Sequence, residues 1–133
     1  MAITVERPAL ARGVASAAVI VVPVAIAGTW LTGGDSPSGV LVAVFSALTI
    51  GGLVLGAAVA ASRQRLGLPL VHGLLTTLVL FAVLQAVRVA RRAIAGDDLE
   101  FARALSNLLV SLVAGTVGGL VGGRLGNRPT TQA

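Results

Sequence analysis

The sequence has 133 residues, of which 56% are hydrophobic and only 11% are charged, whereas about a quarter of the residues in an ordinary soluble domain are charged. The chain is long enough for one domain, its formal net charge is +5, and all ten basic residues are arginines. Cysteine is absent, which excludes a disulfide framework, a thiolate metal site and a thiol nucleophile. This composition predicts an integral membrane protein whose arginines set its topology in the bilayer and do not bind nucleic acid.

Four apolar runs without a charged residue follow one another along the chain, at residues 14–31, 40–61, 66–87 and 105–123. Each is close to the roughly 20 residues that a helix needs to cross about 30 Å of hydrocarbon. The runs are apolar on every face and lack the alternation of polar and apolar residues that a membrane β-barrel requires. The predicted fold class is therefore all-α, an integral membrane bundle of four transmembrane helices in a single domain.

The connection after the third run is the longest of the three and carries most of the charge. Arg88, Arg91 and Arg92 share one helical face if the third helix continues past the membrane. Gly96 then offers a stop, and Asp98 offers a cap, so that residues 98–103 are expected to form the first turns of the fourth helix.

Arginine counts on the two sides of the membrane predict the orientation. With the N-terminus in the cytoplasm, six arginines lie inside and four lie outside, and the first connection, residues 32–39, contains no basic residue. We therefore expect both termini to be cytoplasmic and the protein to lie in the plasma membrane. Trp30, just before that connection, is expected to anchor at the headgroup boundary.

A cleaved signal peptide is the alternative interpretation of the first run. Arg7 and Arg12 precede the run, and Ala25, Ile26 and Ala27 form a small-residue pattern typical of cleavage sites. We favour a retained helix, because the run continues to Leu31 and so reaches a full membrane-spanning length.

Small residues recur every four positions in the second and fourth runs. Such stripes let helices approach closely in lipid, where the hydrophobic effect contributes little to helix association. They serve either the packing of one bundle or a contact with a second protein, and the sequence does not separate the two. The predicted packing residues are Gly52, Gly56, Ser111, Gly115, Gly118, Gly119, Gly122 and Gly123.

Three polar side chains within the runs are candidate intramembrane groups. His72 is the only histidine, and its functional interpretation is a proton relay. The alternative places its ring near the cytoplasmic interface, in reach of water, headgroups or a helix-end backbone group. Gln85 is expected to hydrogen-bond to a neighbouring helix, and Asn107 is a candidate for lining a polar path.

The sequence contains none of the usual patterns of enzyme chemistry. It has no phosphate-binding P-loop, no HExxH motif, no carboxylate within an apolar run and no second histidine for a metal site. We therefore predict no catalytic residues, no metal and no cofactor.

Parts of the sequence between residues 40 and 123 resemble the YrzE-like group of small bacterial four-helix membrane proteins. The resemblance rests on the pair Gly51 and Gly52, the basic turn 63–67, the start of the third run at His72, Gly73 and Leu74, and the glycine-rich stretch 115–123. The chain departs from that group in having Leu68 and Pro69 where an aromatic residue commonly precedes the His-Gly pair. The resemblance implies a four-helix fold in a bacterial inner membrane and implies no activity.

Two functional hypotheses follow. The first is a non-enzymatic packing or accessory subunit that acts through its glycine faces in a homo-oligomer or on a larger membrane protein. The second is a small oligomeric channel or transporter, with His72, Gln85 or Asn107 lining the path.

Overall fold

The computed structural model describes residues 4–31, 36, 38–96, 98 and 100–126. Within them the chain forms four helices and no strand: α1 Arg7–Leu31, α2 Gly39–Arg63, α3 Pro69–Ala95 and α4 Phe101–Gly126. Each helix is long and apolar enough to cross a membrane. The protein is thus an all-α, multi-pass membrane bundle, as the apolar runs predicted.

The helices extend beyond most of the predicted spans. α1 begins at Arg7 instead of residue 14, α3 continues to Ala95 instead of residue 87, and α4 ends at Gly126 instead of residue 123. Apolar runs mark the part of a helix that fits the hydrocarbon, whereas arginine and alanine favour helix on either side of it. Because α3 is continuous through its arginines, Arg88 and Arg92 lie one turn apart on the same helix.

Two helix boundaries between the spans are also informative. Gly96 ends α3 in the left-handed conformation, with φ of 75°, and its N–H donates to the carbonyl of Arg92, which confirms the predicted stop. The predicted start of the fourth helix at Asp98 is wrong, because α4 begins at Phe101 and Glu100 accepts the first bond from the amide of Ala104. α3 begins at Pro69, since proline fits the first turn of a helix and lacks a donor there.

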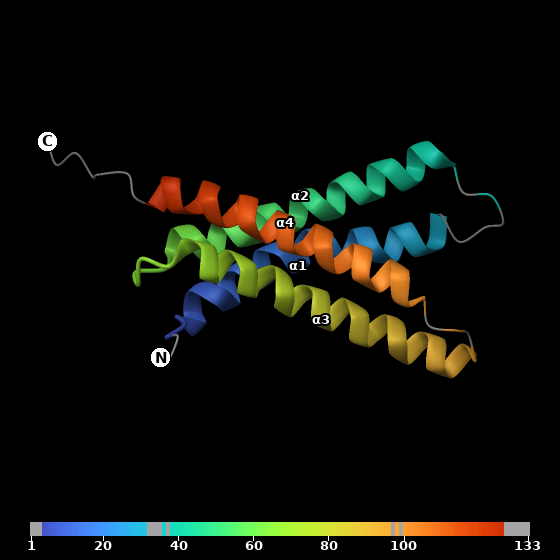
Figure 1. Ribbon diagram of the computed structural model, residues 1–133. Helices are drawn as coiled ribbons and strands as arrows, with labels where there is room; N and C mark the ends of the chain where they lie inside the picture. The colour runs from blue at the N-terminus through green and yellow to red at the C-terminus, as the bar shows by residue number, and fades with distance from the viewer. Residues whose placement is uncertain (1–3, 32–35, 37, 97, 99, 127–133) are drawn as a thin grey trace, which may run out of the picture.

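The helices run up and down, so that both described chain ends lie at the same end of the bundle (Figure 1). The end of α2 and the start of α3 lie at that end as well, and the other helix termini lie at the opposite end. α2 packs between α1 and α4, and α4 packs between α2 and α3.

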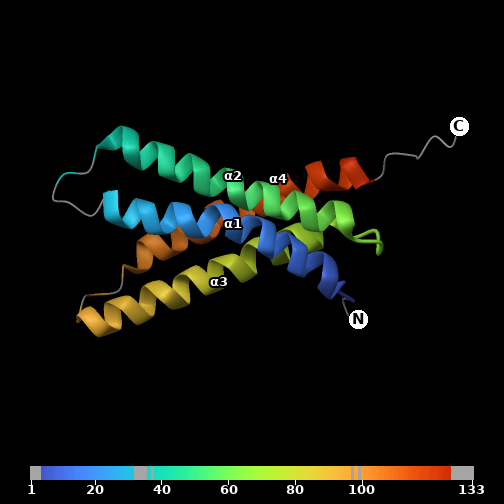
Figure 2. The same cartoon turned by 180° about the vertical axis from the view of Figure 1, so that it is seen from behind.

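The packing is concentrated in one half of the bundle. The buried residues of the described helices fall between Ala9 and Val21 in α1, Gly52 and Ala61 in α2, His72 and Leu80 in α3, and Ser111 and Gly122 in α4. We call this the closed half. The remaining segments, residues 22–31, 39–51, 81–95 and 101–110, form the open half, which holds no buried residue. There α2 and α3 diverge, as both views show (Figures 1 and 2).

Candidate functional site

Glycines of α3 and α4 hold the two helices at backbone contact in the closed half. A Cβ atom added at Gly73 would lie 2.7 Å from the carbonyl oxygen of Gly115 and 2.7 Å from the Cα atom of Gly119. One added at Gly119 would lie 3.1 Å from the Cα atom of Leu70. No side chain fits between these backbones, so glycine is required on both helices.

The other glycines of the two stripes also face helices of the same chain. Gly56 lies against Ala17 of α1, and Gly52 lies against Val21, whose Cγ2 atom would be 2.9 Å from an added Cβ atom. Gly118 lies against Ala57 of α2, and Gly122 against Ala58 and Ala61. Gly123 faces Pro69, and Ser111 is buried and donates to the carbonyl of Asn107 at 2.9 Å. Of the two interpretations of the stripes, these contacts match the packing of one bundle.

The sequence interpretation missed Gly13, which is the α1 partner in this packing. A Cβ atom added at Gly13 would lie 2.7 Å from the carbonyl oxygen of Gly56 and 2.5 Å from the Cβ atom of Ala60. Gly13, Ala17 and Val21 are spaced by four and buried. The spacing was visible in the sequence, but the predicted span began one residue after Gly13.

His72 is fully buried in the closed half and does not reach water or headgroups. The backbone N–H of Glu6 donates to Nε2 at 3.1 Å, and Nδ1 lies 2.9 Å from the carbonyl oxygen of Leu68. These partners fit a ring that carries its hydrogen on Nδ1. Of the groups expected near this histidine, helix-end backbone groups are the ones it contacts. The Glu6 carboxylate accepts from the backbone N–H of Arg65 at 2.9 Å, so the N-terminal segment is also tied to the α2–α3 connection.

A crevice of about 80 Å³, lined by both apolar and polar side chains, lies where the open half begins. Gln85 and Asn107 both line it, which brings two of the predicted polar residues together on facing helices, but His72 is not among its lining residues. The expected bond from Gln85 to another helix is not formed, because its described partner is Arg88 on the same helix, at 3.5 Å. Among the described residues, the Asn107 amide group makes no hydrogen bond. The crevice is lined by Thr49, Leu53, Phe81, Leu84, Gln85, Arg88, Asn107, Val110 and Ser111.

One arginine of the crevice, Arg88, has two further arginines near it. Glu100 pairs with Arg92 at 3.1 Å and with Arg103 at 2.8 Å. Arg88, which lines the crevice, is repelled by both of these guanidinium groups and forms no ion pair with a described residue. The crevice therefore joins the Asn107 amide to the guanidinium group of Arg88.

A further row of small residues lies on the outer side of α2 in the open half. Gly39, Ala43, Ala47 and Gly51 recur every four positions and are all exposed. A Cβ atom added at Gly39 or Gly51 would meet no atom within 4 Å. We call this row the α2 stripe. It differs from the buried stripes in that none of the four described helices covers it.

Comparison of the chain with protein-family models, curated proteins and solved structures finds no match. The resemblance to the YrzE-like group stays a prediction from the sequence.

Proposed function

We propose that the protein is a non-enzymatic accessory subunit that packs against another membrane protein through its open half. The observation that carries this proposal is the uneven burial, since every buried residue of the four described helices lies in the closed half. A bundle whose helices separate at one end offers a partner helix more surface than a uniformly closed bundle does. The crevice adds hydrogen-bonding groups, which contribute to helix association in lipid.

The α2 stripe is the contact surface in this proposal, and a second copy of the chain is its first expected partner. Small residues at four-residue spacing allow two helix backbones to approach closely, and the same stripe on two copies is self-complementary about a twofold axis. The buried stripes cannot serve this purpose while the bundle is intact, because the chain's own helices cover Gly56, Gly115 and Gly119.

The proposed location is a bacterial plasma membrane, with both termini in the cytoplasm. The arginine distribution supports this orientation, with six on the side of the termini and four on the other. It places the closed half near the cytoplasm and the open half near the outer surface.

Cysteine cross-linking in native membranes tests the contact surface, and the chain provides a background without cysteine. Ala47→Cys is expected to form a disulfide-linked dimer on mild oxidation. Leu109→Cys is the matched control. Leu109 is 58% exposed and lies eight residues after the start of α4, just as Ala47 lies eight residues after the start of α2. Equal cross-linking at both positions, or none at Ala47→Cys, would count against the α2 stripe.

Bulky substitution tests whether the contact has a function in assembly. Gly51→Leu is expected to dissociate the complex and leave the bundle folded, because the position has open space around it. Native mass spectrometry of the protein extracted from its own membrane measures the assembly and distinguishes a second copy from a larger partner. A wild-type chain that is monomeric and without a partner under these conditions would overturn the accessory-subunit proposal.

A channel or transporter is the second candidate, and the crevice is the observation that favours it. Gln85 and Asn107 line the same crevice, and several copies would be needed to enclose a path. Reconstituted protein would then move an ion or solute at a rate that falls in Asn107→Leu. Liposomes without flux across the common ions would argue against transport and would leave the accessory role intact.

A further inference from the structure

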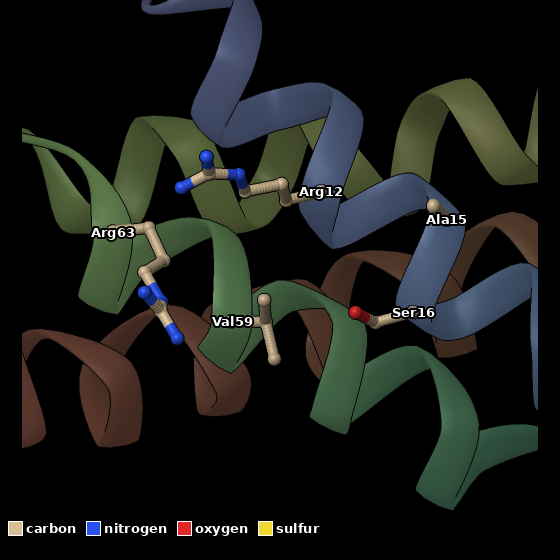
Figure 3. Close-up of a pocket in the computed structure, with 5 residues that line it drawn as sticks. All are labelled: Arg12, Ala15, Ser16, Val59 and Arg63. Atoms are coloured by element: carbon tan, nitrogen blue, oxygen red, sulfur yellow. The ribbon is translucent and has the colours of Figure 1, made fainter.

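A hollow of about 410 Å³ lies between α1 and α2 at the closed end of the bundle. Its volume falls in the range of about 300 to 1,000 Å³ that is usual for small-molecule sites. It opens to the outside of the bundle, and Figure 3 shows the five residues that line it. They are Arg12, Ala15 and Ser16 of α1 and Val59 and Arg63 of α2.

The hollow carries two positive charges that the described part of the chain leaves uncompensated. Arg12 and Arg63 come from different helices, and neither forms an ion pair or a hydrogen bond with a described residue. No carboxylate lines the hollow. The nearest described acidic residue in sequence, Glu6, is already bonded to the backbone N–H of Arg65. Both side chains line the same hollow, with their guanidinium groups extending in different directions from it (Figure 3). Each guanidinium group can donate two parallel N–H bonds to the oxygens of a phosphate group.

The position of the hollow along the helices matches the level of lipid phosphates. Arg12 lies just before the apolar run that begins at Val14, and Arg63 lies just after the run that ends at Ala61. Both arginines therefore lie where the hydrocarbon gives way to headgroups. Ala15 and Val59 supply apolar surface beside them, and the Ser16 hydroxyl lies between the two helices (Figure 3).

We infer that this hollow binds the phosphate group of an anionic phospholipid, with Arg12 and Arg63 as the phosphate ligands. Basic pockets between transmembrane helices are suited to anionic headgroups. An anionic lipid is favoured over a zwitterionic one, because two arginines without a carboxylate repel the choline or ammonium group of the latter. This inference does not depend on the accessory role, since the hollow lies in the closed half and the α2 stripe lies in the open half.

Lipid titration of the purified full-length protein in detergent, followed by native mass spectrometry, tests the inference. Phosphatidylglycerol is expected to bind more tightly than phosphatidylcholine. Arg12→Gln and Arg63→Gln are each expected to weaken phosphatidylglycerol binding about fivefold, and the double variant about 25-fold. Arg124→Gln is the matched control, because Arg124 is exposed at the same end of the bundle and does not line the hollow. It is expected to change binding by less than about twofold.

Two further arms keep the result interpretable. Ser16→Leu fills the hollow without removing a charge and is expected to weaken binding like an arginine variant, so the test does not depend on the charge variants folding. Inorganic phosphate and glycerol phosphate are titrated separately. If these soluble phosphates saturate the site and phosphatidylglycerol does not compete with them, the assignment of a lipid as the ligand is overturned. If wild type, Ser16→Leu and the double variant all bind phosphatidylglycerol equally well, the hollow is not the binding site.

Discussion

His72 shows how one buried side chain can fix the path of a terminal segment. Its ring is fully buried, and its two nitrogen atoms meet the backbone of Glu6, before α1, and of Leu68, before α3. An unsatisfied buried backbone group costs about 1 to 3 kcal/mol, so the ring both fills space and satisfies the amide of Glu6. The histidine therefore links the segment before α1 to the first turn of α3.

Replacement of this ring by an apolar side chain is expected to release the N-terminal segment. His72→Leu leaves the Glu6 amide without its acceptor, and we expect a loss of about 1 to 3 kcal/mol in the free energy of unfolding. Hydrogen exchange of the segment around Glu6 is expected to accelerate tenfold or more in His72→Leu.

Thr76→Val is the control for this prediction. Thr76 is equally buried and lies one turn from His72, but its hydroxyl donates to the His72 carbonyl within the same helix, at 2.8 Å. Removal of such a local bond leaves the helical backbone bonds intact and is expected to change exchange little. Equal acceleration in both variants would show that packing, and not the bond to Glu6, holds the segment.

At the scale of helices, the pairing of α3 with α4 depends on glycine at the points where their backbones meet. Gly73 faces Gly115 and Gly119 across this contact, and all three are buried. Helices in lipid associate through such close packing, because burial of apolar surface from lipid gains little. A single methyl group at the contact therefore forces the two helices apart.

A pair of alanine substitutions separates this contact effect from helix propensity. Gly73→Ala is expected to destabilise the bundle by about 1 to 3 kcal/mol, the usual cost of overpacking. Gly51→Ala adds the same methyl group to open space and is expected to be neutral or to stabilise α2 by up to about 1 kcal/mol. The midpoint of unfolding in dodecyl sulfate, followed by circular dichroism, measures both changes. The same shift in the two variants would contradict the proposed role of Gly73.

Sequence patterns located these glycines but did not pair them. The spacing in α4 identified Gly115 and Gly119 because a four-residue repeat is a local property of one helix. Their partner Gly73 and the contact of Gly13 with Gly56 depend on which helices are neighbours, and that is a property of the fold. The hydrogen bond of Gln85 was assigned to the wrong helix for the same reason.

For the molecule as a whole, the four spans were predictable because the thickness of the hydrocarbon sets the length of an apolar run. The division into a closed and an open half was not predictable. An apolar residue is stable both against lipid and against another helix, so the sequence does not show that Val19 and Val113 are exposed. The hollow beside Arg12 and Arg63 was missed similarly, because arginines between runs were interpreted only as topology signals.

The up-and-down arrangement predicts a pattern of labelling across the membrane. Ser36→Cys and Asp98→Cys lie at one end of the bundle, and Leu66→Cys lies at the other. With cytoplasmic termini, a membrane-impermeant maleimide is expected to label the first two in intact cells and the third only after the membrane is disrupted. The reverse pattern would invert the orientation, and labelling of Ser36→Cys and Leu66→Cys from the same side would contradict a bundle with four spans.

The backbone contacts of the closed half bear on how this gene can change. One nucleotide separates a glycine codon from an alanine codon, so a single-nucleotide substitution is enough to place a methyl group at Gly73 or Gly122, where backbone atoms of a neighbouring helix already lie. The same change at Gly39 or Gly51 meets no atom of the chain. Selection on folding alone is therefore expected to restrict the first pair strictly and to leave the second pair free to vary, unless a partner occupies the space beside it.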